Sequence, residues 1–246
     1  MQKNTAYLKL PFQFNKEKLA HDLSLIFDGN WISHFNTTGY HGDWKAISLY
    51  APKGEESNIF ALSTFDSIIS ETATLKKCQY FKEVINSFEC PILTARILRL
   101  GVGAEIKPHR DHALGYEDGN FRLHIPIVTN SNVHFKLDGT ELKMLPGECW
   151  YTNVNYVHSV KNKGESDRVH LVIDGKRNEW SDRLFFSLAP AESFQPIPKE
   201  DDSEETIKRT IEELKQLNEP IAKQMINELL SKLTELNENT TKAKLL

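Results

Sequence analysis

The sequence predicts a mainly β protein, a jelly-roll sandwich or barrel of antiparallel strands. The first observation behind this prediction is that hydrophobic and polar residues alternate along the chain from Leu93 to Asp174. Such a period of two is typical of strands that bury one face. The second observation is that the alternation falls into short segments, about eight in all, with glycine, proline, asparagine and aspartate residues between them.

Each of these segments is a predicted strand. They are Leu93–Leu100, Gly103–His109, Phe121–Val128, Val133–Leu137, Thr140–Leu145, Glu148–Thr152, His158–Asn162 and Arg168–Asp174. Asp138-Gly139, between two of them, favours a tight hairpin turn. Strands this short and this closely spaced pack as two sheets around one core.

The N-terminal part of the chain adds helices and one more strand. Apolar residues at helical spacing predict a helix over Lys16–Asp28, with Asn15 as its N-cap. The same spacing predicts a helix over Cys78–Phe88, and the apolar run Trp44–Ala51 predicts a strand. We expect these elements to form an α/β extension of a β domain that spans residues 1–187.

The C-terminal part is predicted to be a linker followed by a helical hairpin. Three prolines and an acidic run mark residues 188–202 as the linker. In residues 203–246, Ser203 and Asn218 are good N-caps for two helices. The apolar stripes of these helices are Ile207, Ile211, Leu214, Ile221, Met225, Leu229 and Leu233. We expect the hairpin to pack on the β domain or on a second copy of the chain, as in a homodimer.

Composition and charge argue against several classes of partner. The chain has 246 residues, of which 39% are hydrophobic and 26% charged, as in ordinary soluble proteins. The formal net charge of −4 gives no general attraction for nucleic acid or anionic membranes. No apolar run is long enough for a signal peptide or a membrane span. The three scattered cysteines predict neither a disulfide framework nor a thiolate zinc site, so we expect a cytoplasmic protein.

Two histidines and one carboxylate lie near the ends of predicted strands. His109 and Asp111 are two residues apart, so on an extended chain their side chains point to the same side. His158 begins another strand, which a jelly roll can bring alongside. Such a set holds a non-haem Fe(II) on one face and leaves other coordination positions open. The pattern therefore predicts a metal site, with a solvated turn or polar network as the alternative.

Arg168 opens the strand that follows the His158 strand. We expect these two strands to pair, which would place the guanidinium beside the metal. A guanidinium grips a carboxylate at two points, as an organic-acid co-substrate of the iron would require. The alternative is a structural salt bridge with Asp174 or Glu165.

Three runs of the sequence resemble the aspartyl/asparaginyl β-hydroxylase family. They are Pro91–His112, Arg122–Ile127 and Gly147–Asp174, and a weaker similarity covers Trp44–Gly54. The most specific pieces are the sequences RLH, HSVKN and RVHLVID within these runs. Together the similar segments cover roughly half the chain.

The resemblance implies a double-stranded β-helix fold and an activity that depends on Fe(II), 2-oxoglutarate and O2. The iron ligands that it implies are His109, Asp111 and His158. By the same resemblance, Arg168 would pair with the distal carboxylate of 2-oxoglutarate and His124 would contribute to 2-oxoglutarate binding. Arg122 would bind either the co-substrate or a substrate carboxylate.

Asp111 separates this sequence from the animal peptidyl hydroxylases of the family, which lack the carboxylate ligand. In this respect the chain resembles bacterial members that act on small molecules, such as proline hydroxylases. We therefore expect a dioxygenase that hydroxylates an unactivated C–H bond of a free amino acid or a similar small carboxylate-bearing substrate, releasing succinate and CO2. The alternatives are a hydroxylase of Asp or Asn side chains in a protein or peptide, and a non-catalytic cupin-like barrel that binds a ligand.

Overall fold

A computed structural model describes residues 4–61 and 68–195, together with residues 207–208, 211–212, 226–227, 229–231 and 233–234. The chain divides into two compact units, Met1–Gln195 and Pro196–Leu246. In the second unit the described residues are helical, and Ile207, Ile211 and Leu233 form a small buried cluster. The rest of the predicted hairpin, and residues 196–202 of the predicted linker, lie outside the described residues.

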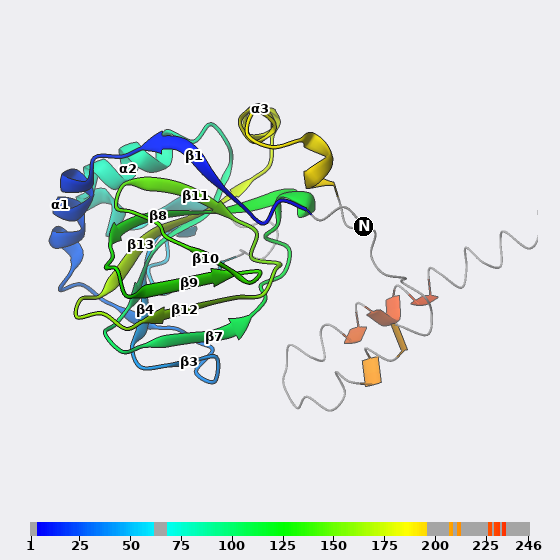
Figure 1. The fold of residues 1–246 in the computed structure, drawn as a ribbon, viewed down its shortest axis with the longest axis horizontal. Coiled ribbons are helices and arrows are strands. Elements are labelled where there is room, and N and C mark those ends of the chain that lie inside the picture. The colour runs from blue at the N-terminus through cyan, green and yellow to red at the C-terminus, as the bar shows by residue number, and fades with distance from the viewer. Residues whose placement is uncertain are drawn as a thin grey trace, which may run out of the picture. The chain divides into compact units, whose positions relative to one another are not determined.

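The first unit is built from two antiparallel sheets that face each other (Figure 1). The larger sheet has the order β1-β11-β8-β13-β6-β4-β2, with β5 paired to β4, and the smaller has the order β10-β9-β12-β7-β3. The strands of the larger sheet are β1 (Tyr7–Gln13), β2 (Ile32–Ser33), β4 (Trp44–Pro52), β5 (Ile69–Glu71), β6 (Ile92–Leu100), β8 (Asn120–Val128), β11 (Glu148–Thr152) and β13 (Arg168–Lys176). Those of the smaller sheet are β3 (Tyr40–His41), β7 (Glu105–His109), β9 (Val133–Leu137), β10 (Thr140–Leu142) and β12 (His158–Asn162). This arrangement is the predicted jelly roll, a double-stranded β-helix.

The eight strands predicted between Leu93 and Asp174 are all present, as β6 to β13. The strand β4 and the helices α1 (Lys16–Ile26) and α2 (Gln79–Asn86) are confirmed as well. Asn15 caps α1 as predicted, because its side-chain oxygen accepts a hydrogen bond of 2.8 Å from the backbone N–H of Lys18. The elements that the sequence pattern did not reveal are β1, β2, β3, β5 and α3 (Glu179–Phe186).

The predicted pairing of the Arg168 strand with the His158 strand is wrong. The strand β13 lies between β8 and β6 in the larger sheet, whereas β12 lies between β9 and β7 in the smaller one. In this jelly roll the chain crosses from one sheet to the other between β12 and β13, so these neighbours in sequence do not pair. Arg168 and His158 are consequently on opposite sheets, and their side chains point into the interior between them.

The main hydrophobic core lies between the outer face of the larger sheet and the helices α1 and α2 (Figure 1). The period of two sends Leu123, Leu171 and Ile173 into this core, where they are almost completely buried. The alternate residues of the same strands face the interior between the sheets. The sequence alternation therefore separates a packing face from a cavity face.

The first unit extends through Gln195, which includes the beginning of the predicted linker. A short 3-10 helix, Ala191–Phe194, carries Phe194 into the main core. The N-terminal segment pairs with it, because the backbone N–H of Thr5 donates to the carbonyl of Ser193 at 2.9 Å. Residues 188–195 thus pack on the β domain.

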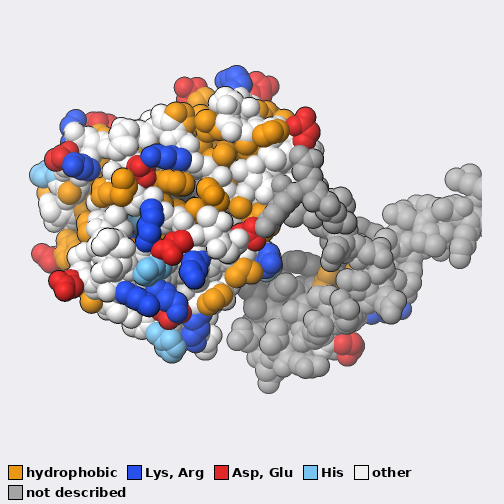
Figure 2. Space-filling model, in the orientation of Figure 1, with side chains coloured by type: hydrophobic (Ala, Val, Ile, Leu, Met, Phe, Trp, Pro, Cys, Tyr) orange, Lys and Arg blue, Asp and Glu red, His pale blue; other side chains and the backbone are white. Residues whose placement is uncertain are grey.

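The outer face of the smaller sheet carries charged side chains of both signs (Figure 2). Lys161 pairs with Glu105 at 2.8 Å, and Lys143 with Glu141 at 2.7 Å. Mixed charges of this kind are typical of a solvated sheet face. None of the described helices is both long enough and apolar enough to cross a membrane.

Candidate metal and co-substrate site

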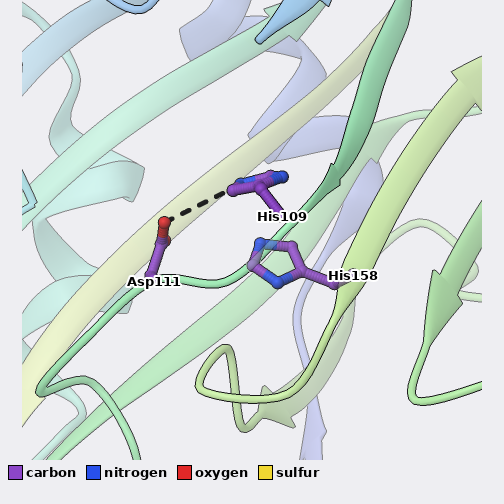
Figure 3. Close-up of side chains that lie close together, drawn as sticks. All are labelled: His109, Asp111 and His158. Carbon is purple, nitrogen blue, oxygen red and sulfur yellow. Dashed lines mark ion pairs between the residues drawn. The ribbon is translucent and has the colours of Figure 1, made fainter. Parts of the chain in front are cut away.

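The three predicted metal ligands lie together at one end of the interior (Figure 3). His109 ends β7 and His158 begins β12, and these two residues are directly opposite each other in the antiparallel pair. Asp111 follows β7 by two residues. One ligand atom from each of the three side chains lies within 4.8 Å of the others. This geometry allows one ion to contact all three.

Backbone carbonyls orient both imidazoles. Nδ1 of His109 lies 2.8 Å from the carbonyl oxygen of Lys107, and Nδ1 of His158 lies 3.0 Å from that of Tyr156. Because a carbonyl can only accept, each Nδ1 carries the proton and each Nε2 presents its lone pair. Burial, and next the neighbouring His109, lower the pKa of His158 to about 4. The neutral imidazole that a metal requires is therefore the form present at neutral pH.

Arg122 holds the carboxylate of Asp111. Nη1 of Arg122 donates to Oδ2 of Asp111 at 2.6 Å, and the backbone N–H of Asp111 donates to the carbonyl of Val154 at 2.9 Å. Burial opposes ionisation of Asp111, but Arg122 and the two histidines outweigh it and lower the pKa of this carboxyl. Asp111 is thus an oriented, ionised carboxylate.

A buried ionic network extends from Arg122 into the larger sheet. Its centre is Asp174, which is fully buried. Asp174 accepts hydrogen bonds from Nε of Arg122 at 2.7 Å, from Nη2 of Arg96 at 2.6 Å and from Oγ1 of Thr94 at 2.9 Å. Arg96 was not among the predicted site residues. The feature that could have revealed it is an arginine at an inward position of a predicted strand, because a buried guanidinium needs an anionic partner.

Arg168 lies elsewhere in the interior and has no acidic partner among the described residues. It is 2% exposed. Asp174 pairs with Arg96 and Arg122, and no ion pair joins Arg168 to Glu165, so the alternative of a structural salt bridge is wrong. Nη2 of Arg168 donates to Nδ1 of His170 at 2.9 Å, and Nε has no hydrogen-bond partner. Burial lowers the pKa of Arg168 to about 9. A buried guanidinium without a counter-charge is costly unless a ligand supplies one.

His124 lies on the same inner face, on β8. It is 5% exposed and its Nδ1 has no hydrogen-bond partner among the described residues. Burial, and next Arg168, keep the pKa of His124 well below its usual range. The imidazole is therefore neutral.

One cavity of about 740 Å³ joins these groups. Its lining includes all six residues predicted to form the site, namely His109, Asp111, His158, Arg122, His124 and Arg168. Arg96 also lines it, and the aromatic residues His34, Phe35 and Phe60 line it as well. The volume is within the range of about 300–1,000 Å³ that is usual for sites that enclose a small organic ligand.

Comparison with known proteins identifies similar sequences. Residues 13–178 match the family model described as Aspartyl/Asparaginyl beta-hydroxylase. The L-proline cis-3-hydroxylases 2 and 1 of a Streptomyces species are each 26% identical to this chain, over 165 and 168 residues. These alignments cover 66% of this chain and 57% of each relative, so the chain spans little more than half the length of the relatives that it matches.

Solved structures of similar fold include a 2OG-Fe(II) oxygenase family oxidoreductase from Burkholderia pseudomallei, with a TM-score of 0.48 and 14% identity. That match covers 70% of this chain and 86% of the other. A prolyl-4-hydroxylase from Pseudomonas putida has a TM-score of 0.46 and 9% identity, over 70% of this chain and 93% of the other.

Proposed function

The chain belongs to the aspartyl/asparaginyl β-hydroxylase family, and on this premise we propose that it is an Fe(II)- and 2-oxoglutarate-dependent dioxygenase. The proposed reaction hydroxylates an unactivated C–H bond of a free amino acid or a similar small carboxylate-bearing substrate. The observation that carries the proposal is that a three-residue ligand group and the unpaired cation of Arg168 line the same cavity.

The donor set fits Fe(II). Two imidazole nitrogens and one carboxylate oxygen are the donor types that would hold a non-haem Fe(II) here. The remaining ring nitrogens of His109 and His158 donate to backbone carbonyls, as is usual for metal-bound histidines. Arg122 orients Asp111 in the same way.

The unpaired groups deeper in the cavity fit a dicarboxylate co-substrate. Arg168 offers N–H donors that match a carboxylate, and His170 fixes the guanidinium from the side. The neutral His124 lines the same cavity. A carboxylate bound here would satisfy a buried cation and at least one buried N–H at once.

When bound, Fe(II) supplies the redox chemistry that couples oxidative decarboxylation of 2-oxoglutarate by O2, giving succinate and CO2, to hydroxylation of the substrate. The protein's own residues bind and orient the reactants. Arg168 and His124 hold one end of the co-substrate, Arg122 holds Asp111 in place, and the barrel walls exclude water. Similarity to L-proline cis-3-hydroxylases supports an amino acid as substrate.

Asp111→Ala tests the metal site. We expect the rate of Fe(II)-dependent conversion of 2-oxoglutarate to succinate to fall on the order of 100-fold or more in this variant. Loss of a residue that only orients a metal ligand already costs about 10- to 100-fold, and loss of the ligand itself should cost at least as much. Mn(II) affinity, measured without turnover, should fall with it. The control is Asp28→Ala, an exposed aspartate that follows α1. Full activity in Asp111→Ala would refute the ligand assignment.

A substrate panel tests the reaction. Succinate formation should be stimulated by free amino acids, with proline, aspartate and asparagine as the first to be tried. Stimulation by peptides or proteins alone would favour hydroxylation of Asp or Asn side chains in a macromolecule. A chain that binds Mn(II) but never consumes 2-oxoglutarate would support the non-catalytic barrel.

A further inference from the structure

Arg122 and Arg96 share one carboxylate, and this leaves a positive charge in the cavity wall. Both guanidiniums bind Asp174, and among the described residues the only other acid in the network is Asp111, a proposed metal ligand. With a divalent ion bound at Asp111, this wall would carry more positive than negative charge. A buried excess charge of this kind demands a further counter-charge.

Of the two arginines, Arg96 makes fewer hydrogen bonds to carboxylates. Arg122 already binds two carboxylates, through Nε and Nη2 to Asp174 and through Nη1 to Asp111. Nη1 of Arg96 donates to the carbonyl of Ile59 and Nη2 to Asp174, but Nε has no hydrogen-bond partner among the described residues. Arg96 is 4% exposed and lines the cavity. The bonds to Ile59 and Asp174 use one N–H of each terminal nitrogen, so the second N–H of each is available to an anion in the cavity.

This anion site is distinct from the one at Arg168. In the sheet register Arg96 is opposite Val172, which is four residues beyond Arg168 on β13. At about 3.3 Å per residue, the backbone positions of the two arginines are offset by roughly 13 Å along the strand direction. The cavity thus has the unpaired cation of Arg168 at one level and Arg96, which shares Asp174 with Arg122, at another.

Exposed aromatic rings lie next to the Arg96 site. Phe35 and Phe60 are 58% and 50% exposed, line the same cavity and pack on each other with ring centroids 4.9 Å apart. Phe60 directly follows Ile59, whose carbonyl holds Arg96. Two large exposed rings at the edge of a cavity are typical of a ligand-binding surface.

The space between the cation and the rings is lined in part by apolar side chains. Leu98 is two residues beyond Arg96 on the same inner face of β6, and Ile106 lines the cavity from β7. His34 lies at the same wall, stacked between Phe35 and Trp44 with ring centroids 4.3 and 3.5 Å away. A ligand whose carboxylate reached Arg96 would lay its remainder against these rings.

We propose that Arg96 binds the carboxylate of the substrate and that Phe35 and Phe60 bind its apolar part, so that the preferred substrates are amino acids with large aliphatic or aromatic side chains. The proposal rests on the proposed dioxygenase function and narrows its substrate class. It also assigns Arg122 to positioning Asp111 and not to binding the substrate.

The first test compares ligands and removes the rings. With Mn(II) and 2-oxoglutarate bound, leucine and phenylalanine should perturb the tryptophan fluorescence at concentrations about tenfold lower than proline or aspartate. Phe35→Ala with Phe60→Ala should remove most of this difference and leave the affinity for 2-oxoglutarate unchanged. Leu25→Ala, an equally exposed apolar side chain on α1, is the control. Tighter binding of proline or aspartate than of leucine and phenylalanine would overturn the proposal.

The second test separates the two arginines. Arg96→Lys keeps the charge beside Asp174 but loses the planar fork, so it should raise the KM for the amino acid about tenfold or more with little change in the KM for 2-oxoglutarate. Arg168→Lys should do the reverse. Arg96→Gln is the second variant, and its thermal midpoint reports whether the fold survives. A rise in the KM for 2-oxoglutarate alone in Arg96→Lys would contradict the assignment.

These readouts distinguish the two proposals. If 2-oxoglutarate is consumed but apolar amino acids neither bind nor stimulate its consumption, the substrate class is wrong and the dioxygenase function stands. If leucine binds in an Arg96-dependent way but no condition yields succinate, the anion site stands and the dioxygenase function is wrong.

Discussion

The two faces of the larger sheet are built from the same strands and have opposite characters. On β13 the outward residues Val169, Leu171 and Ile173 belong to the hydrophobic core under the helices. The inward residues between and beside them include Arg168 and His170, which are buried but polar. Burial of apolar surface on the outer face stabilises the fold. Burial of charged and polar groups on the inner face destabilises it.

This contrast shows how the fold tolerates an expensive cavity. Arg168, Arg96 and His124 each retain a buried nitrogen without a partner among the described residues. Each such group opposes folding by about 1–3 kcal/mol. The outer face and its helices must offset this penalty, so substitutions on the two faces should separate stability from binding.

The largest expected effect is a loss of stability when a core residue on the outer face of the larger sheet is truncated. Leu171 is completely buried, and Leu171→Ala should lower the free energy of unfolding by about 2–5 kcal/mol. Urea denaturation measures this change. Leu25→Ala, on an exposed position of α1, should change it by no more than about 0.5 kcal/mol. The folded fraction of Leu171→Ala should still bind Mn(II), and a protein that stays folded but loses Mn(II) binding would show that the two faces are not separable.

The inner face should respond in the opposite way. Arg168→Met removes an unpaired buried cation and keeps a flexible side chain of similar length, so the stability of the ligand-free protein should be unchanged or raised. The apparent affinity for 2-oxoglutarate should fall about 30-fold or more, or roughly 2 kcal/mol, because a charge-assisted pair is lost. Calorimetric titration of the Mn(II) form measures the affinity. A large loss of stability with unchanged affinity would place Arg168 among the structural residues.

Much of the outer-face pattern and of the metal site could be predicted from local sequence. The period of two identified the strands β6 to β13, and the spacing of His109 and Asp111 placed both on one side of an extended segment. These features depend on neighbouring residues, which a single sequence displays directly. Short elements such as β2 and β3 have too few residues to show any period.

The partners of the inward charges could not be predicted, because they depend on strand order. Arg168 and Asp174 are on one strand and seemed natural partners, yet an even spacing of six residues places them far apart on one face. Asp174 instead pairs with Arg122 and Arg96, on the strands to either side of β13. β1 was missed because it contains Pro11, which argues against a strand; the structure tolerates this proline at the edge of the sheet, within an irregular stretch of the pairing.

The smallest expected effect concerns the neutral histidines of the inner face. Burial, and next Arg168, hold the pKa of His170 well below its usual value. The unfolded chain binds a proton at this position below pH about 6.5, whereas the folded chain does not. His170 therefore has no effect on stability above that pH and lowers stability as the pH falls, by about 1.4 kcal/mol per pH unit.

His124 contributes in the same direction, because its pKa is lowered by the same causes. Urea denaturation between pH 7.5 and 5 should show the combined slope. His170→Gln keeps a polar group beside Arg168 without the titration, so it should reduce the slope by about one proton, or 1.4 kcal/mol per pH unit. The control, His21→Gln on the exposed face of α1, should leave the slope as it is. An unchanged slope in His170→Gln would mean that His170 takes up its proton in the folded state as easily as in the unfolded chain, so that the inner face is wetter than its burial indicates.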